Sequence, residues 1–263
     1  MNEEFKYVKL EIRERAAWII LNRPEVHNAL SAALLNELGV AVANAASNKE
    51  IRVIVLTAEG EQAFSSGADL KDGFNETEKT LGDRLRANYE PVIEGIRSCP
   101  KPVICRMNGL AAGAGMSLAL ACDLVIAADH AYMTELFVGI GLMPDAGSMF
   151  FLPRLVGMQK AFELISTGRK VQMPEAEKLG LVNKIVPFNE LDDAVGQLVS
   201  YYAQAPTMAI GLMKKALNVS YESSLREMLD LEAEGQTACG FSNDFGEGVM
   251  AFLQKRKPDF KGR

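Results

Sequence analysis

The pattern of apolar and polar positions predicts strands alternating with helices over the first part of the chain. Short β-rich runs lie at residues 7–12, 16–21, 52–57, 102–107 and 123–128. Helices are expected over residues 31–46 and up to about residue 98, the second after the polar stretch Asp72–Lys79. Strands that alternate with helices favour a layered α/β core.

Helical periodicity replaces this alternation from residue 191 onward. The helices predicted there cover residues 191–204, 206–219, 223–239 and 244–255. We therefore expect a core domain at residues 1–195 and a helical region at residues 196–263. The apolar faces of these last helices need a cover, which is either the chain's own core or a partner subunit.

Composition narrows the class of protein. The chain has 263 residues, of which 48% are hydrophobic, so it can bury a substantial core. A net charge of -6 disfavours nucleic acid as a partner, and no apolar run approaches the roughly 20 residues of a membrane span. The charged N-terminus, residues 1–6, does not resemble a signal peptide. The four cysteines have no C-x-x-C spacing, which indicates reduced thiols and fits a cytoplasmic protein.

Two segments rich in glycine and alanine are the most informative part of the sequence. They are residues 63–70 (AFSSGADL) and 108–116 (NGLAAGAGM). With so little side-chain bulk, their backbone N–H groups can approach a ligand, and two facing turns of this kind would form an oxyanion hole. One such donor contributes roughly 3 kcal/mol to catalysis in other enzymes. The alternative is that the small residues only allow a helix to pack closely on a sheet.

Other chemistries find little support. Residues 113–115 and 139–141 each supply G-x-G, but neither continues to the third glycine of a dinucleotide-binding fingerprint. The chain has no phosphate-binding G-x-x-x-x-G-K-[ST] loop. Its two histidines, His27 and His130, are far apart in the sequence, which disfavours a histidine-rich metal site or a Ser-His-Asp triad.

Asp145 is the carboxylate with the most suggestive surroundings. It lies between a proline and small residues in an otherwise apolar stretch, where burial would raise its pKa and make it a better base. Alternatively, Asp145 caps the helix that follows, because Asp is a favoured N-cap residue. Asp69 and Glu135 are weaker candidates for the base.

Four motifs together identify a family resemblance. They are residues 19–24 with 28–30, residues 64–70, residues 108–123 and residues 141–145. With them, nearly the whole chain, including the tail 252–263, resembles the enoyl-CoA hydratase/isomerase (crotonase) superfamily. The resemblance implies a spiral of ββα units, a helical C-terminal region that builds trimers or pairs of trimers, and a pocket for a CoA thioester. It implies no metal or redox cofactor.

The resemblance also implies roles for individual residues. The N–H groups of Ala68 and Ala114 would form the oxyanion hole, and the carbonyls of Ser66 and Ala68 would meet the adenine. Lys257 or Lys261 of a neighbouring subunit would approach the CoA phosphates. The other substrate contacts that it implies are Val26, Ala29, Gly67, Asp69, Leu70, Lys71, Gly113, Phe137 and Leu142.

Two departures from the family pattern point to a particular reaction. Hydratases of the family hold a water molecule with two glutamates, and Ser117 and Phe137 stand at those places here. Asp145 falls where several isomerases of the superfamily, including ring-epoxide isomerases of phenylacetate breakdown, carry one acid-base carboxylate. The sequence therefore predicts an acyl-CoA isomerase in which Asp145 moves a proton.

Three alternatives stay open. The protein could be a hydratase-like enzyme. It could be a dehalogenase or hydrolase, in which Asp145 either attacks the substrate as a nucleophile or activates a water molecule. It could also be a family member that only binds acyl-CoA. The choice between straight-chain and aromatic acyl groups also stays open, because the stretch around residues 72–91 and the terminal helices are expected to shape that end of the pocket.

Overall fold

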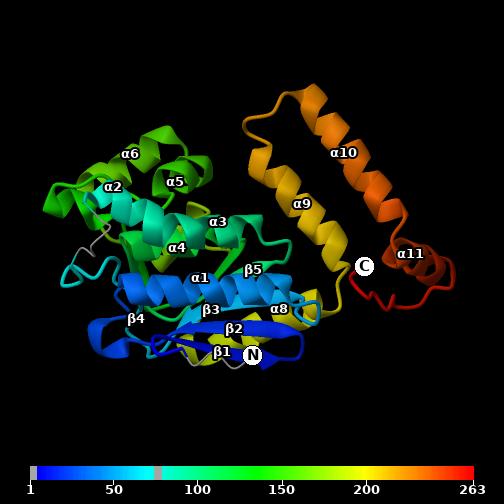
Figure 1. The fold of residues 1–263 in the computed structure, drawn as a ribbon, viewed down its shortest axis with the longest axis horizontal. Coiled ribbons are helices and arrows are strands. Elements are labelled where there is room, and N and C mark those ends of the chain that lie inside the picture. Colours follow the sequence, from blue (N-terminus) through cyan, green and yellow to red (C-terminus); the bar gives the residue numbers. More distant parts are fainter. Residues whose placement is uncertain (1–4, 74–78) are drawn as a thin grey trace.

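The computed structural model describes residues 5–73 and 79–263 (Figure 1). Most of the predicted polar stretch Asp72–Lys79 therefore lies outside the described residues. The larger of two sheets has the strand order β1-β2-β3-β5-β7-β10. Its strands are β1 (Val8–Arg13), β2 (Ala16–Leu21), β3 (Val53–Ala58), β5 (Val103–Met107), β7 (Leu124–Ala128) and β10 (Lys184–Val186). The first pair is antiparallel and the rest are parallel.

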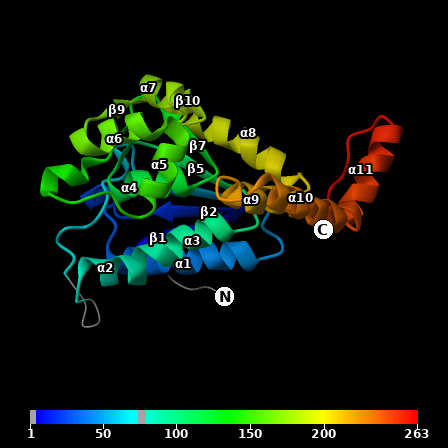
Figure 2. The same ribbon diagram turned by 90° about the horizontal axis from the view of Figure 1, so that it is seen from above.

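Helices cover both faces of this sheet. Along β2, Ile19 and Leu21 belong to the core that contains the apolar faces of α1 (Ala32–Ser47) and α3 (Glu90–Ser98). The alternate residues Trp18 and Ile20 pack with α8 (Leu191–Ala203) on the other face. Figure 2 shows α1 and α3 on one side of the strands and α8 on the other. Because both faces are buried, the strands read as continuous apolar runs rather than alternating ones.

A second, smaller sheet has the order β4-β6-β8-β9. Its strands are β4 (Ala63–Ser65), β6 (Leu110–Ala112), β8 (Tyr132–Thr134) and β9 (Val171–Gln172). The strands β3, β5 and β7 of the large sheet are each followed by a strand of the small one, and then by helical segments. The predicted spiral of ββα units is therefore confirmed.

The remaining helical segments complete the layers around the sheets. They are α2 (Leu81–Arg84), a π-helical turn (Leu85–Tyr89), α4 (Ala114–Ala121), a 3-10 turn (Leu136–Ile140), α5 (Ser148–Val156), α6 (Met158–Thr167) and α7 (Met173–Lys178). Short 3-10 turns also occur at Pro24–Val26 and Phe188–Glu190. Cys99, Cys105 and Cys122 are free thiols buried in the core, and Cys239 is free and partly exposed.

Three helices leave the core as an arm, here called the C-terminal arm: α9 (Thr207–Val219), α10 (Leu225–Gly240) and α11 (Asn243–Leu253). Figure 1 shows them beside the core rather than across it. An ion pair of 2.7 Å between the buried Lys214 and the partly buried Asp123 ties α9 to the core. The predicted boundary between residues 195 and 196 falls inside α8, which packs on the sheet, so the arm begins after α8 instead. None of the helices described is long and apolar enough to cross a membrane.

Candidate active site

The small sheet brings together three segments that are far apart in sequence. Strands β4, β6 and β8 are parallel neighbours, so their carboxyl ends lie at one edge. The chain leaves this edge at residues 66–70, at 113–114 and at 135–137. The Gly113 N–H donates to the Thr134 carbonyl at 2.8 Å and holds two of these segments together. Carboxyl ends of neighbouring parallel strands are a recurrent place for ligand sites.

The two glycine and alanine segments contact each other through their main chains. Gly67 has a φ of +90°, and a Cβ there would lie 2.6 Å from the Ala112 carbonyl oxygen and 3.4 Å from the Ala114 nitrogen. A Cβ on Gly115 would lie 2.5 Å from the Ser65 carbonyl oxygen. Both glycines are therefore required by close packing, and this packing also brings the backbone of residues 67 and 68 next to the start of α4.

The backbone at Ala68 and Ala114 suits a pair of hydrogen-bond donors. Leu30 forms a parallel bridge with Ala68, donating from its N–H to Gly67 at 2.8 Å and accepting from the Asp69 N–H at 3.1 Å. In such a bridge the amide of the central residue, Ala68, points away from the partner strand. Ala114 is the first residue of α4, so its N–H has no acceptor within the helix. The positive end of the helix dipole adds to its attraction for an anion.

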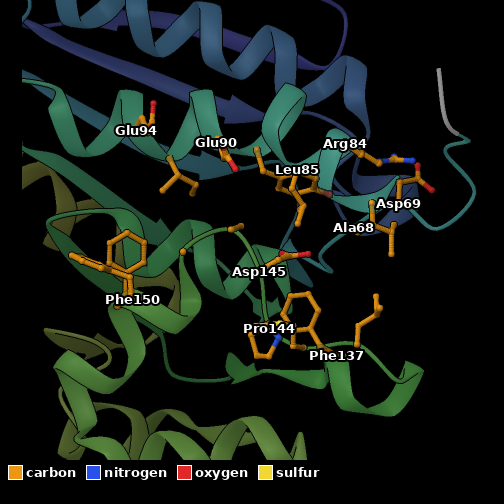
Figure 3. A pocket seen from close by; sticks show the side chains of 18 of the residues that line it. Ala68, Asp69, Arg84, Leu85, Glu90, Glu94, Phe137, Pro144, Asp145 and Phe150 are labelled. Carbon is orange, nitrogen blue, oxygen red and sulfur yellow. The ribbon is translucent and has the colours of Figure 1, made fainter. Parts of the chain in front are cut away.

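A cavity of about 1150 Å³ opens beside this edge. In Figure 3 its lining passes from Ala68, Asp69 and Arg84 at one end, past Asp145, to Glu94 and Phe150 at the other. Most of the lining is apolar. Of the predicted site residues, the cavity is lined by Ala68, Asp69, Leu70, Phe137, Leu142 and Asp145.

Asp145 presents a desolvated carboxyl to this cavity. It lies in the turn before α5, and Figure 3 shows its side chain between those of Leu85 and Phe137. The Oδ1 atom is buried without a hydrogen-bond partner among the described residues, and burial raises the pKa of Asp145 to about 6. The N-cap of α5 is Gly147, with no side-chain cap, so Asp145 does not cap this helix. A carboxyl with this pKa can accept and return a proton near neutral pH.

Ser117 and Phe137 have clear roles in this arrangement. The buried Ser117 hydroxyl donates to the Asp145 carbonyl at 2.9 Å, which connects α4 to the turn that carries the acid. The Phe137 ring lies against Gly113, with its Cζ 3.5 Å from the position of a Cβ on that glycine. One residue thus positions Asp145, and the other supplies an apolar wall where a carboxylate would attract water.

The two weaker candidates for the base have other partners. Asp69 pairs with Arg23 at 2.8 Å; burial alone would raise its pKa, but hydrogen bonds from Arg23 and from the Lys71 N–H bring the pKa below its usual value. Glu135 is 1% exposed and accepts a hydrogen bond from Ser148 at 2.7 Å. Neither lines the cavity as a free base, since Asp69 is engaged and Glu135 lies behind the wall.

Several predicted contacts lie outside the cavity lining. Those in the segments behind its wall are Val26, Ala29, Ser66, Gly67, Gly113 and Ala114. Lys71 is exposed, Lys257 donates to Gln204 at 2.8 Å, and Lys261 pairs with Asp259 at 2.6 Å. Within one chain, neither tail lysine is part of the cavity lining.

The sequence did not identify the individual residues of the opposite wall. Arg84, Leu85, Tyr89, Glu90 and Glu94 line the cavity from α2 to α3, within or next to the stretch expected to shape the acyl end. Asn218 of α9 joins them, and its amide oxygen accepts from Arg97 Nε at 3.1 Å. A distance of 121 positions separates these two residues, so no local pattern could have paired them. No group of His, Cys, Asp and Glu side chains in the described part of the chain is arranged to hold a metal ion.

Comparison with known proteins gives the class of this site. The family model for enoyl-CoA hydratase/isomerase matches residues 11–263. The chain is 45% identical over 256 residues to a Rhodobacter capsulatus protein described as a probable enoyl-CoA hydratase, covering 97% of this chain and 98% of that one. It is 35% identical over 263 residues to the 1,2-epoxyphenylacetyl-CoA isomerase of Escherichia coli, covering 98% and 99% of the two chains.

Solved structures agree with the sequence comparisons. The crystal structure of an enoyl-CoA hydratase from Bacillus anthracis superposes with a TM-score of 0.90 at 34% identity, covering 98% of this chain and all of that one. The chain belongs to the enoyl-CoA hydratase/isomerase family. The superfamily resemblance and the fold predicted from the sequence are thereby confirmed.

Proposed function

We propose that the protein is an acyl-CoA isomerase that shifts a double bond from the 3 to the 2 position of an enoyl-CoA, or acts on a related ring-epoxide acyl-CoA. The substrate is the CoA thioester, and the reaction uses no metal or redox cofactor. The observation that carries the proposal is the desolvated carboxyl of Asp145 on the cavity wall, with Ser117 and Phe137 where a hydratase of the family has its two glutamates.

The steps follow from the chemistry of the thioester. The Asp145 carboxylate takes a proton from C2, and the electron pair moves onto the thioester oxygen to give a dienolate. The amides of Ala68 and Ala114 stabilise the negative oxygen. Protonated Asp145 then returns the proton to C4, which leaves the double bond between C2 and C3. Because this step regenerates the Asp145 carboxylate, one carboxyl is sufficient for the whole reaction.

The apolar surroundings support this assignment. Phe137, Leu142 and Pro144 line the cavity beside Asp145. They keep water away from the dienolate, so hydration or hydrolysis competes poorly with proton return. They also strengthen the hydrogen bonds from the two amides, because electrostatic interactions gain strength as water is excluded.

The test is incubation of the purified protein with a 3-enoyl-CoA in deuterated water. We expect a conjugated 2-enoyl-CoA, with deuterium introduced at C2 or C4 when Asp145 exchanges its proton with solvent. The Asp145→Asn variant should lose about 10²- to 10⁴-fold in kcat while binding CoA nearly as well. The proposal is wrong if this variant keeps most of the isomerase rate.

The main alternative is hydration, which the relative at 45% identity supports by its description. A hydratase would convert a 2-enoyl-CoA, supplied in a parallel incubation, to a 3-hydroxyacyl-CoA. Release of free CoA thiol would instead indicate a hydrolase. Binding of acyl-CoA with none of these products would indicate a non-catalytic family member.

We also propose that the C-terminal arm forms a trimer or a pair of trimers, as the family resemblance implies. Phe241, Phe252 and Leu253 are 88%, 83% and 69% exposed in the single chain. Large apolar patches of this kind usually mark an interface. Assembly would also allow Lys257 or Lys261 to reach the CoA phosphates bound by a neighbour. Sedimentation analysis gives the number of chains directly.

A further inference from the structure

Glu135 is a buried carboxyl for which the proposed reaction has no direct use. It follows β8 and is 1% exposed. Its Oε1 accepts a hydrogen bond from the Ser148 hydroxyl at 2.7 Å, and its Oε2 is buried without a partner among the described residues. A buried ionised carboxylate with one open oxygen is costly, so such groups are usually neutral or functional.

Glu135 lies between the two halves of the site. Its chain neighbour Thr134 accepts the Gly113 N–H at 2.8 Å, directly before the amide of Ala114. On the other side Ser148, which binds the Glu135 side chain, donates from its own N–H to the Asp145 carbonyl at 3.0 Å. A change at Glu135 is therefore transmitted both to the oxyanion segment and to the turn that carries the acid.

We infer that Glu135 is a positioning residue for Asp145: it holds the 145–148 turn through Ser148, remains protonated while Asp145 acts as the base, and stops the reaction when it ionises. This inference rests on the role proposed for Asp145. The Glu135 carboxyl touches neither the substrate nor the reacting atoms. Its ionisation accounts for the loss of activity at high pH.

The order of ionisation follows from the surroundings of the two carboxyls. Burial raises the pKa of Glu135 to about 7, the hydrogen bond from Ser148 opposes this shift, and the charge of Asp145 adds to it. Burial raises the pKa of Asp145 to about 6. Because Glu135 is almost fully buried and Asp145 is partly exposed, Asp145 loses its proton first, and its charge then raises the pKa of Glu135. Once Glu135 ionises, its charge lies against the 145–148 turn and disfavours the negatively charged dienolate.

In the described part of the chain Glu135 forms no ion pair, and Lys178 of α7, the helix that contacts β8, is exposed. Helix α4 and the 3-10 turn after Glu135 contain no ionisable residue. Lys170 lies over the Tyr132 ring. The charged side chains of α5 and of the α6 region are engaged in the ion pairs Arg154–Glu222, Lys160–Glu163 and Arg169–Glu175.

Carboxyl titration tests the coupling without any assay of activity. We would follow the ¹³C-labelled carboxyls of Asp and Glu by NMR in the free protein. We expect Asp145→Asn to lower the midpoint of Glu135, because a neighbouring negative charge is removed, and Glu135→Gln to abolish the upper step while the lower one stays. A Glu135 midpoint near 4.5, or one that Asp145→Asn does not move, would overturn the inference. The result stands even if the isomerase reaction is not found.

The pH dependence of kcat tests the consequence for catalysis. In the wild type we expect kcat to fall about tenfold per pH unit above pH 7, as the fraction with neutral Glu135 decreases. Glu135→Gln keeps an oxygen that accepts from Ser148 but cannot ionise, so its alkaline fall should disappear. Ser148→Ala should lower kcat roughly tenfold and retain the alkaline fall. A Glu135→Gln profile with the wild-type shape, only lower, would indicate a purely structural residue and would overturn the inference.

Discussion

The two walls of the cavity are built by different means. The backbone wall is formed at Ala68, with the main chain of Ala114 directly behind it, and the contacts of Gly67 and Gly115 hold these segments together. The wall with Asp145 uses a side chain on a turn, held by hydrogen bonds to the carbonyl of that same residue. In the proposed reaction the first wall contributes no ionisable group, whereas the second depends on the protonation state of the Asp145 carboxyl.

The difference between the backbone wall and the side-chain wall explains how one fold can support several reactions. A backbone wall is determined by packing, so it tolerates few substitutions; in the proposed reaction it stabilises an enolate. A side-chain wall can change its chemistry by substitution of single residues. Here Ser117 and Phe137 offer no carboxylate, and the desolvated carboxyl on the cavity lining is that of Asp145. Substitutions in the two walls should therefore have different signatures.

The largest effect on the free energy of unfolding is expected from Gly115→Ala in the backbone wall. Its Cβ would lie 2.5 Å from the Ser65 carbonyl oxygen and 2.7 Å from the Ser65 Cβ, so α4 must move away from the neighbouring turn. We expect a loss of about 1–3 kcal/mol in the free energy of unfolding and of about 10²-fold in kcat, at all pH values alike. Urea unfolding and isomerase kinetics measure the two losses.

Gly139→Ala is the matched control for this prediction. A Cβ at Gly139 meets nothing within 4 Å, and its φ is not in the left-handed region, so stability should change by no more than about 0.5 kcal/mol. Equal losses in the two variants would mean that the close approach at Gly115 does not hold the wall.

In the side-chain wall, Asp145→Asn is expected to have a smaller effect on the free energy of unfolding, and this effect should depend on pH. Because the pKa of Asp145 rises from 3.8 to about 6 on folding, the folded protein retains a proton that the unfolded chain has lost between about pH 4 and 6. Stability contributed by this group therefore falls as the pH rises through that window. Asp145→Asn removes the buried charge and should stabilise the protein at pH 8 by about 1–2 kcal/mol, allowing for its partial exposure, but not at pH 4.

Denaturant titrations of both proteins at the two pH values test this sign. Asp193→Asn, at an exposed aspartate of α8, should give nearly the same small difference at both. If Asp145→Asn destabilises the protein at pH 8, the carboxylate has a stabilising partner and is not a desolvated base.

Much of this site could be predicted from the sequence, but not its supports. The glycine and alanine segments and Asp145 are local features, visible without any contact information. In contrast, β4, β6 and β8 have three residues each, too few to establish a period of two. These strands bring the three parts of the site together. Because the sequence pattern does not predict them, it does not show why those parts meet.

Contacts between positions far apart in the chain also could not be predicted from the sequence. The bond from Ser117 to Asp145 joins positions 28 residues apart, and that between Ser148 and Glu135 joins positions 13 apart. Helix α8 shows the same limit at the level of the fold. Its buried Leu191, Val195 and Val199 form an apolar stripe that any amphipathic helix could have, and nothing in that stripe says that the sheet, rather than a partner, covers it.

The smallest effect is expected from Ser117→Ala, which touches both walls. The variant loses the 2.9 Å hydrogen bond to the Asp145 carbonyl, but the Ser148 N–H still donates to that oxygen at 3.0 Å, so no buried acceptor is left open. We expect a loss of about 1 kcal/mol in the free energy of unfolding and of roughly fivefold in kcat, with KM little changed. Ser47→Ala removes a similar hydroxyl at the exposed end of α1, where it donates to Asn44 at 3.2 Å, and serves as the control. An unchanged kcat in Ser117→Ala would mean that α4 does not position the acid, and that the two walls act independently of each other.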